Sequence, residues 1–398
     1  MDITVFPRKL NGAVQAIPSK SQAHRLLICA ALSENETRLV CPETNQDIEA
    51  TVSCLQALGA SITRTKDGYH VIPIIQAPAQ ALLPCQESGS TLRFMLPVVG
   101  ALGVDGIFEL KGRLPSRPLS PLWEEMERMG CTLSRPSENT IRCNGKLRPG
   151  DYYIDGGISS QFITGLLLAL PLLSENSRIC ITGQLESAPY LRITQNAMSL
   201  FGVNTENYSI QKQSCYKTPH EVTVEGDWSN AAFFITARAL GNNISISNLN
   251  PHSPQGDRII EKLLSRLNEN CTISAADVPD LVPILSVAAA YHHGCTFTDI
   301  GRLRLKESDR VEAVIQMLNS LGIHSEATET TLTVYPGKFH GGIISSYNDH
   351  RIAMASAIAA TVADSPVTIL DAHCVAKSYP GFWDEYTRLG GHYEQYIR

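Results

Sequence analysis

One pattern recurs six times along the chain and restricts the folds open to it. Each copy opens with a polar, often charged cluster before an apolar helical stretch, and about forty residues later it closes with a bulky residue followed by Gly or Asn. The openings are Ser19-Lys20-Ser21, Gly89-Ser90-Thr91, Ser159-Ser160-Gln161, Trp228-Ser229-Asn230, Pro279-Asp280-Leu281 and Asn348-Asp349-His350-Arg351. The closings are Leu58-Gly59, Met129-Gly130, Phe201-Gly202, Leu267-Asn268, Leu321-Gly322 and Leu389-Gly390. Such a repeat indicates one structural unit that packs against copies of itself.

The first copy shows the order of elements that we expect in each unit. Its apolar pattern predicts helices over 22–32 and 47–58, with Gly59 ending the second helix. Short strands are predicted over 38–40, 60–63 and 69–72, the last two joined by the hairpin signal Asp67-Gly68. Six such α/β units fit two groups of three better than a solenoid. The first dozen residues read as a strand, and the last unit is expected to end in a loose tail rich in Tyr and Gly.

Composition narrows the class of protein. With 398 residues, 43% of them hydrophobic, the chain can form more than one core. Its net charge of −6 disfavours a general nucleic-acid or membrane-surface binder. Eleven cysteines without a CxxC pair or zinc spacing fit reduced thiols. The N-terminus lacks a signal-peptide pattern, and no apolar run is long enough to span a membrane, so we expect a soluble cytoplasmic protein.

The side chains suited to binding and catalysis lie at the starts of the predicted helices. A helix N-terminus attracts anions, and basic side chains there are slightly unfavourable. Several nevertheless lie at or near such starts: Lys20, Arg25, Arg93, Lys306, Arg310 and Arg351. A bound, multiply charged anion explains this placement better than solvated surface charge does. Ser159 and Ser160 add hydroxyl donors, and the charged string 303–310 can hold an acid and a base close together.

Seven motifs, in order, connect these starts to a known family. They are Pro-Ser-Lys-Ser-x3-Arg at 18–25, Ser-Gly-Ser-Thr-x-Arg at 88–93, Arg-Pro-Leu at 117–119, Ser-Ser-Gln-Phe at 159–162, Lys-Glu-Ser-Asp-Arg at 306–310, Asp-His-Arg at 349–351 and Lys-Ser-Tyr-Pro at 377–380. Each motif is weak alone. Together, from Pro18 to about Leu389, the chain resembles the 5-enolpyruvylshikimate-3-phosphate synthase family of enolpyruvyl transferases.

The resemblance implies a fold and a reaction. It implies an α/β protein of two domains, each of three βαβαββ units forming an inside-out α/β barrel, with the active site in a cleft between them that closes on the substrates. Residues 18–226 would form the N-terminal domain, and 1–17 with 227–398 the discontinuous C-terminal domain. The enolpyruvyl group of phosphoenolpyruvate would pass to the 5-hydroxyl of shikimate 3-phosphate, with release of phosphate. No metal, cofactor, nucleic acid or membrane partner is implied, and a monomer is expected.

The resemblance also implies site residues. Catalysis would fall to Lys20, Asp280, Glu307 and Lys377, with Asp280 as the base. The ligands of shikimate 3-phosphate would be Lys20, Ser21, Arg25, Ser159, Ser160, Gln161, Ser187, Asp280 and Lys306, with Tyr190 beside the ring. Phosphoenolpyruvate would be held by Lys20, Gly89, Arg117, Gln161, Arg310, Arg351 and Lys377.

Departures from the family pattern and two rival functions stay open at this point. Arg302 stands where some members carry an Asn that contacts the shikimate phosphate, and Glu87 and Phe94 also differ, so glyphosate sensitivity is not predicted. The nearest alternative is the related transferase that acts on UDP-N-acetylglucosamine. That family carries Lys-Asn at the first helix start, where this chain has Lys20-Ser21. A non-catalytic, anion-binding relic is the other alternative, although the proton-transfer residues are all present.

Overall fold

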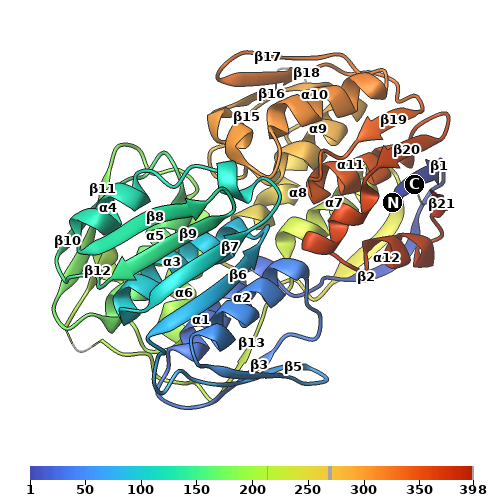
Figure 1. The fold of residues 1–398 in the computed structure, drawn as a ribbon. Coiled ribbons are helices and arrows are strands. Elements are labelled where there is room, and N and C mark those ends of the chain that lie inside the picture. Colours follow the sequence, from blue (N-terminus) through green and yellow to red (C-terminus); the bar gives the residue numbers. More distant parts are fainter. Residues whose placement is uncertain (213, 268–270, 397–398) are drawn as a thin grey trace. The chain divides into compact units, whose positions relative to one another are not determined.

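The structure, a computed structural model, describes residues 1–212, 214–267 and 271–396. The chain forms two compact units, each with its own apolar core. Unit 1 combines Met1–Ile17 with Gly226–Arg398, and unit 2 is the continuous segment Pro18–Glu225. The chain therefore passes from one unit to the other at two points, after Ile17 and after Glu225 (Figure 1). Asn268, the predicted close of the fourth copy, lies outside the described residues.

The core of unit 2 is built on helices that are buried nearly all round. They are α1 (Lys20–Ala31), α3 (Gly89–Leu102) and α5 (Ser160–Ala169). Their apolar residues are not confined to one stripe, which is typical of a helix enclosed by other elements; α5 packs against both α1 and α3. The remaining helices leave one face exposed: α2 (Gln46–Ala57), α4 (Leu122–Arg128) and α6 (Ala188–Leu200). Short 3₁₀ turns are η1 (Leu114–Ser116), η2 (Leu170–Leu172) and η3 (Glu206–Tyr208).

The strands of unit 2 form sheets ordered β13-β3-β5-β4, β6-β7-β9-β8 and β10-β11-β12. Their bounds are β3 (Thr37–Val40), β4 (Ser61–Arg64), β5 (Gly68–Ile72), β6 (Gln80–Gln86), β7 (Asp105–Leu110), β8 (Cys131–Ser137), β9 (Thr140–Gly145), β10 (Asp151–Asp155), β11 (Ser177–Thr182), β12 (Ser209–Ile210) and β13 (Glu221–Thr223). Each sheet starts with a parallel pair and continues with antiparallel strands. A helix connects β6 to β7 and β10 to β11, as parallel pairing requires.

Unit 1 repeats this plan. Its buried helices α7 (Trp228–Ala239), α9 (Val282–Tyr291) and α11 (His350–Ala360) pack against one another. Around them lie α8 (Ile260–Leu264), α10 (Arg310–Ser320) and α12 (Phe382–Arg388). The 3₁₀ turns are η4 (Gly256–Ile259), η5 (Gly301–Leu305) and η6 (Ala372–Lys377).

The sheets of unit 1 are ordered β14-β2, β15-β16-β18-β17 and β19-β20-β1-β21. Their bounds are β1 (Asp2–Phe6), β2 (Asn11–Gln15), β14 (Asn243–Ser247), β15 (Thr272–Ser274), β16 (Cys295–Thr298), β17 (Ser325–Ala327), β18 (Thr331–Val334), β19 (Gly342–Ser345), β20 (Val367–Leu370) and β21 (His392–Tyr396). The N-terminal strands are thus part of this unit, since β1 lies between β20 and β21 and β2 pairs with β14.

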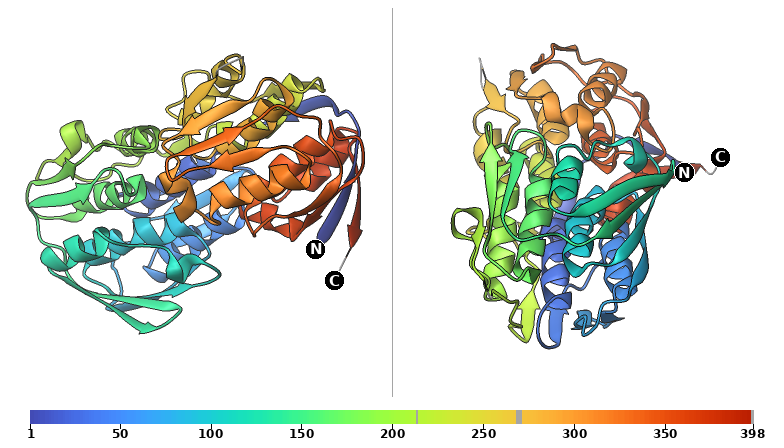
Figure 2. Two further views of the ribbon diagram at one scale, coloured as in Figure 1. Left: turned by 90° about the horizontal axis from the view of Figure 1, so that it is seen from above. Right: turned by 60° about the vertical axis from the view of Figure 1, so that its left-hand side comes forward.

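The expected loose tail at the C-terminal end is wrong. Strand β21 pairs antiparallel with β1 over five residues, from Asp2 opposite Tyr396 to Phe6 opposite His392, and Figure 2 shows the two terminal strands side by side. Most side chains of β21 are exposed, so the segment lacks the alternation that marks a half-buried strand. Its order depends on a partner at the other end of the chain, which no local pattern reports.

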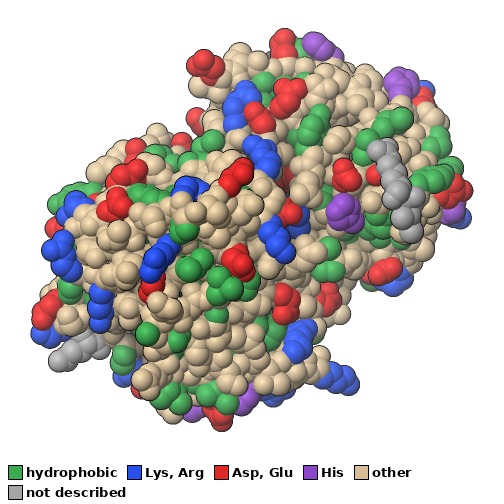
Figure 3. Space-filling view, in the orientation of Figure 1, with side chains coloured by type: hydrophobic (Ala, Val, Ile, Leu, Met, Phe, Trp, Pro, Cys, Tyr) green, Lys and Arg blue, Asp and Glu red, His purple; other side chains and the backbone are tan. Residues whose placement is uncertain are grey.

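The surface carries charge of both signs. Lys, Arg, Asp and Glu side chains are interspersed over the face drawn in Figure 3, without a large region of one sign. Of the helices that the structure describes, none combines the length and the apolar character needed to cross a membrane.

Candidate active site

The starts of α3 and α5 in unit 2 are joined by one side chain, Gln161. Its carbonyl oxygen accepts a hydrogen bond from Arg93 Nη1 at 2.9 Å, and its Nε2 donates to Ser90 Oγ at 3.0 Å. Gln161 lies in the first turn of α5, while Ser90 and Arg93 lie in the first turns of α3. The starts of α3 and α5 are therefore in contact. Gln161, a predicted ligand of both substrates, lies at that contact.

Arg25 extends this group to α1 and is buried, with 2% of its surface exposed. It donates hydrogen bonds to the Thr194 and Thr164 hydroxyls at 2.7 and 3.3 Å, and to the Ser21 and Tyr190 carbonyls at 2.6 and 3.2 Å. All four acceptors are uncharged, and no carboxylate in the described ranges pairs with this guanidinium. Burial lowers the pKa of Arg25 to about 9, which still leaves it protonated at neutral pH. A buried cation without a counter-ion favours an anionic ligand.

A second concentration of positive charge surrounds Gly89, the first residue of α3. A Cβ atom at Gly89 would lie 2.5 Å from Arg117 Nη1 and 2.9 Å from Arg93 Nη1, so two guanidinium groups lie against the glycine backbone. Within the described part of the chain, the buried Nε of Arg117 has no hydrogen-bond partner. Because the N-terminus of α3 adds partial positive charge, the predicted phosphoenolpyruvate ligands Gly89 and Arg117 form a suitable anion site.

Lys20, the first residue of α1, forms an ion pair with Asp47 in the first turn of α2, with 2.9 Å between Nζ and the carboxylate oxygen. Both side chains are mostly buried, at 14% and 17% exposure. The ion pair fixes the direction of the lysine ammonium group. Asp47 is not a predicted site residue, although it is the first residue of the helix predicted over 47–58.

The predicted phosphate-binding serines lie at the starts of neighbouring helices. Ser159 is the N-cap of α5 and accepts a hydrogen bond from the Gln161 amide at 3.3 Å, and Ser160, the next residue, is buried. Ser187 is the N-cap of α6, which packs against α5. Its φ of 56° lies in the left-handed region, which is uncommon for a residue other than glycine and occurs often at functional sites.

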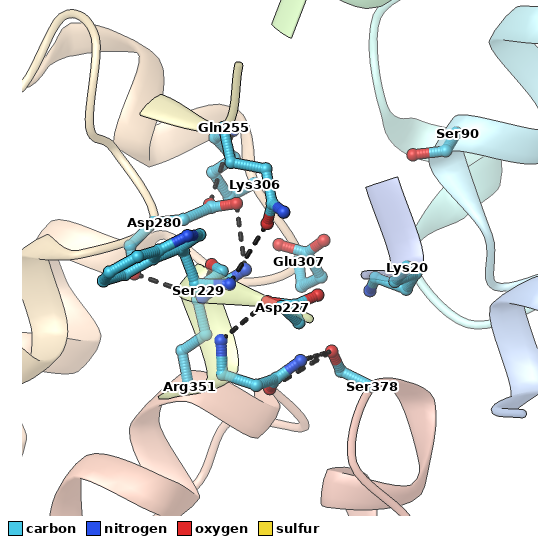
Figure 4. Close-up of polar contacts among 12 residues, drawn as sticks. Lys20, Ser90, Asp227, Ser229, Gln255, Asp280, Lys306, Glu307, Arg351 and Ser378 are labelled. Atoms are coloured by element: carbon cyan, nitrogen blue, oxygen red, sulfur yellow. Dashed lines mark hydrogen bonds and ion pairs between the residues drawn. The ribbon is translucent and has the colours of Figure 1, made fainter. Parts of the chain in front are cut away.

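In unit 1, Arg351 joins the starts of the buried helices, as Figure 4 shows. Its Nη1 donates to Ser229 Oγ in the first turn of α7 at 2.8 Å. Its Nη2 lies 2.9 Å from Asp280 Oδ2, just before α9. Arg351 is itself the second residue of α11, whose N-cap is Asp349. The helix starts of unit 1 thus meet around one guanidinium group.

Asp280 and Arg310 form the centre of an ion-pair network. Arg310 is fully buried, and its guanidinium lies 2.8 Å from Asp280, 2.7 Å from Glu307 and 3.0 Å from Asp349. Burial lowers the pKa of Arg310, but these carboxylates outweigh that effect and raise it. Lys306 Nζ lies 3.8 Å from Asp280 Oδ1. Neighbouring cations favour the ionised carboxylate, the form of Asp280 that can accept a proton.

The lysines of unit 1 lie beside this network. Burial, reinforced by Arg302 and Arg310 and opposed by Asp280, lowers the pKa of Lys306 to about 8. Lys377 is 8% exposed at the end of η6, and its Nζ donates to the Asn348 carbonyl at 2.9 Å. Lys377 therefore lies next to the start of α11. Among the described residues, no group of three or more His, Cys, Asp or Glu side chains is placed to hold a metal ion.

The structure brings each predicted site residue to one of these two groups of helix starts, and it adds others. The added residues are Asp47, Ser90, Arg93, Ser229 and Asp349. All of them belong to the openings of the repeats or to the first turn of a predicted helix. The position of each residue at a helix start could be seen in the sequence. Its partner could not: apart from Asp47, whose partner Lys20 belongs to the same repeat, each of these side chains contacts a residue of another repeat.

Comparison with known proteins shows the family to which this chain belongs. The family model for EPSP synthase (3-phosphoshikimate 1-carboxyvinyltransferase) matches residues 6–386. The 3-phosphoshikimate 1-carboxyvinyltransferase of Clostridium botulinum is 37% identical over 425 aligned positions, and that of Clostridium perfringens 39% over 417; each alignment covers 98% of both chains.

Solved structures confirm the predicted α/β fold. EPSP synthase from Acinetobacter baumannii superimposes with a TM-score of 0.79 at 23% identity, covering 99% of this chain and 100% of that one. The enolpyruvyl transferase NikO from Streptomyces tendae gives 0.74 at 16% identity, covering 99% and 98%. With a family model that spans nearly the whole sequence and full-length relatives above one-third identity, this chain belongs to the EPSP synthase family.

Proposed function

We propose that this chain transfers the enolpyruvyl group of phosphoenolpyruvate to the 5-hydroxyl of shikimate 3-phosphate and releases phosphate. The curated relatives are named for this carboxyvinyl transfer. The observation that carries the proposal is Arg25, a buried cation whose described partners are all neutral. A site for an anionic substrate explains why such a charge is kept in the interior.

Unit 2 supplies ligands that suit phosphate, hydroxyl and carboxylate groups. Ser159, Ser160 and Ser187 offer hydroxyl donors to the phosphate of shikimate 3-phosphate. Arg25 and Ser21 hold the ring and its hydroxyls beside Tyr190. The remaining ligands, which serve phosphoenolpyruvate, are Lys20, Gly89, Arg117 and Gln161.

Unit 1 supplies the groups for proton transfer. Asp280, kept ionised by its neighbouring cations, accepts the proton of the 5-hydroxyl as that oxygen bonds to C2 of phosphoenolpyruvate. Glu307, Lys377 and Lys20 serve the proton transfers at the methylene carbon, which gains one proton as C2 bonds to the hydroxyl oxygen. The tetrahedral intermediate then loses a proton from that carbon, the bond from C2 to the phosphate oxygen breaks, and phosphate leaves.

The cations of unit 1 stabilise the charge that develops in this reaction. Arg310, Arg351 and Lys377 offset the negative charge of the phosphoenolpyruvate carboxylate and of the departing phosphate. Lys306 binds shikimate 3-phosphate. The reaction steps balance without an oxidant or a reductant, because the methylene carbon loses the proton that it gained and the proton of the 5-hydroxyl leaves with the phosphate.

Phosphate release from phosphoenolpyruvate tests the reaction. We expect release with shikimate 3-phosphate and none with UDP-N-acetylglucosamine; release with the sugar nucleotide alone would contradict the proposal. Arg25→Gln is expected to raise the KM for shikimate 3-phosphate about 10- to 100-fold, the effect of losing a hydrogen bond to a charged group.

Arg64→Gln is the matched control. Like Arg25, Arg64 donates to neutral acceptors and lies over an aromatic ring, 4.5 Å from the Tyr69 centroid. Arg64 is exposed, lies on β4, and donates to the Cys41, Gly68 and Pro42 carbonyls, none of which is a predicted site residue. Its substitution should leave the KM unchanged, so equal effects of the two variants would show that Arg25 has a structural role only.

A further inference from the structure

Two buried threonines that the proposed mechanism does not use hold the guanidinium group of Arg25. Thr164 lies on α5 and Thr194 on α6, and both side chains are fully buried. Thr194 Oγ1 accepts a hydrogen bond from Arg25 Nε at 2.7 Å, and Thr164 Oγ1 accepts one from Arg25 Nη2 at 3.3 Å. The two hydroxyl oxygens lie 2.9 Å apart. An arginine of α1 is therefore held by a pair of hydroxyl groups from two other helices.

Donor and acceptor chemistry fixes the position of each proton in this group. The single hydroxyl proton of Thr194 is donated to the Tyr190 carbonyl at 3.0 Å, so Thr194 is an acceptor toward its other partners. The proton between the two threonines therefore comes from Thr164. The Thr194 hydroxyl thus donates once and accepts twice, which is its full capacity. Because no alternative arrangement of these protons satisfies the group, Arg25 is held in one orientation.

The donors of Arg25 show what is left for a substrate. A guanidinium group has five N–H donors in a fixed planar arrangement. Thr194 takes the Nε donor, Thr164 and the Tyr190 carbonyl take those of Nη2, and the Ser21 carbonyl takes one of Nη1 at 2.6 Å. Within the described ranges, the second N–H of Nη1 has no acceptor. Since the group is planar, the contacts of the other donors fix the direction of this one.

The same contacts join the helix starts that carry proposed ligands of shikimate 3-phosphate. Thr164 lies one turn after Ser160 in α5, and Thr194 lies on α6, whose N-cap is Ser187. Arg25 lies on α1, which packs against both of these helices. The two threonine hydroxyls therefore fix the guanidinium relative to the phosphate-binding serines.

We propose that Thr164 and Thr194 are positioning residues for the binding of shikimate 3-phosphate: their hydroxyls hold the Arg25 guanidinium so that its remaining Nη1 donor is directed at an oxygen of this substrate. The inference rests on the function proposed above and on Arg25 as a ligand. Without the Thr194 hydroxyl, the buried Nε donor loses its acceptor. The guanidinium then turns toward other oxygens, and its Nη1 donor no longer meets the substrate.

Thr194→Val is the first test, because valine keeps the shape of the side chain and replaces the hydroxyl with a methyl group. The KM for shikimate 3-phosphate should rise about tenfold, within the range for a lost hydrogen bond to a charged group, while kcat stays nearly unchanged. The KM for phosphoenolpyruvate, measured with shikimate 3-phosphate saturating, should not change. If Thr194→Val does not fold, Thr164→Val takes its place, with a smaller expected rise because its bond to Arg25 is longer.

Thr194→Ser separates positioning from packing. Serine keeps the hydroxyl and loses a buried methyl group, so this variant should melt at a lower temperature than the wild type. Its KM for shikimate 3-phosphate should nevertheless match the wild type, in contrast to Thr194→Val. A KM raised equally in both variants would show that the packing of the side chain matters rather than its hydroxyl, and would overturn the proposal.

Thr37→Val is the matched control. Thr37 of β3 is also buried in unit 2, and its hydroxyl lies 2.8 Å from the Thr218 hydroxyl, so the same substitution breaks a similar threonine pair. Neither of these residues is a predicted ligand. Both KM values should stay at the wild-type level. A KM for shikimate 3-phosphate raised as much as in Thr194→Val would indicate a general effect of lost hydrogen bonds and would contradict positioning.

A double-mutant cycle shows whether the threonine acts through the arginine. Adding Thr194→Val to Arg25→Gln should change the KM for shikimate 3-phosphate little further, because the guanidinium that the hydroxyl orients is already gone. Effects of the two substitutions that multiply independently would mean that Thr194 does not act through Arg25.

The outcomes separate this inference from the proposed function. Turnover by the wild type together with an unchanged KM in Thr194→Val overturns the inference alone. An unchanged KM in Arg25→Gln removes the ligand on which it rests. If the wild type releases no phosphate, the proposed function fails, and calorimetric titration with shikimate 3-phosphate still tests the inference. Weaker binding by Thr194→Val than by the wild type then supports it, and equal binding, or none by the wild type, overturns it.

Discussion

The charge of Lys306 depends on its surroundings, and this gives a pH prediction at the scale of one residue. Burial is the largest cause that lowers its pKa to about 8, so Lys306 is charged below pH 8 and neutral above it. As a proposed ligand of shikimate 3-phosphate, Lys306 should hold this substrate more weakly as the pH passes 8. The KM for this substrate, measured from pH 6.5 to 9.5, should rise above pH 8 in the wild type. Lys306→Met should show a high KM that is independent of pH in this range.

The same shift predicts the pH dependence of stability. The pKa of a lysine in an unfolded chain is about 10.4, above the folded value, so the folded state releases the proton first. Below pH 8 the folded protein carries the full cost of the buried charge, and this cost is relieved as the pH rises from about 8 to 10.4. Urea unfolding of the wild type relative to Lys306→Met should show increasing relative stability over this window. A constant difference would contradict the shift.

At the scale of the element, replacing either of two aspartates that cap helices of unit 1 should lower the free energy of unfolding by different amounts. Asp309 caps α10 and is 40% exposed, whereas Asp349 caps α11, is fully buried and also holds Arg310 at 3.0 Å. Asp309→Ala should lower the free energy of unfolding by about 1 kcal/mol, the usual contribution of an N-cap side chain. Asp349→Ala should lower the free energy of unfolding by about 3–5 kcal/mol, because it also removes one partner of the buried Arg310 guanidinium.

Urea denaturation of the two variants measures this difference directly. The residue type, the substitution and the capping role are the same, so the extra loss in Asp349→Ala reports the ion-pair network. Equal free energies of unfolding would mean that Glu307 and Asp280 satisfy Arg310 without Asp349.

The sequence predicted elements whose signals are local. The end of α2 before Gly59 and the two strands around the Asp67-Gly68 turn follow from glycines and apolar spacing, and the helix predicted from residue 22 begins two residues earlier, at Lys20. It did not predict β21 or the partners of Arg351. Strand β21 is specified by pairing with β1, and Arg351 contacts Ser229 and Asp280, which belong to other repeats. A charge network between repeats depends on distances that spacing along the chain does not encode.

At the scale of the whole molecule, the continuity of the two cores predicts which segments fold alone. Unit 2 is one continuous segment with its own core, so a protein of residues 18–225 should unfold cooperatively on heating. Residues 226–398 lack β1, which lies between β20 and β21, and β2, which pairs with β14. That fragment should show no cooperative transition until a peptide of residues 1–17 is added.

The effect of shikimate 3-phosphate on the stability of the 18–225 fragment tests whether unit 2 alone binds this substrate. Because Arg25, Ser160 and Ser187 all belong to unit 2, shikimate 3-phosphate should raise the melting temperature of the 18–225 fragment. At a hundredfold excess over Kd the gain is about 2.7 kcal/mol, which differential scanning calorimetry resolves. The Arg25→Gln fragment should melt at a temperature that the ligand changes less, and inorganic phosphate should give a smaller shift than the full substrate. A wild-type fragment that unfolds cooperatively but does not respond to shikimate 3-phosphate would show that the serines and Arg25 do not form a binding site by themselves.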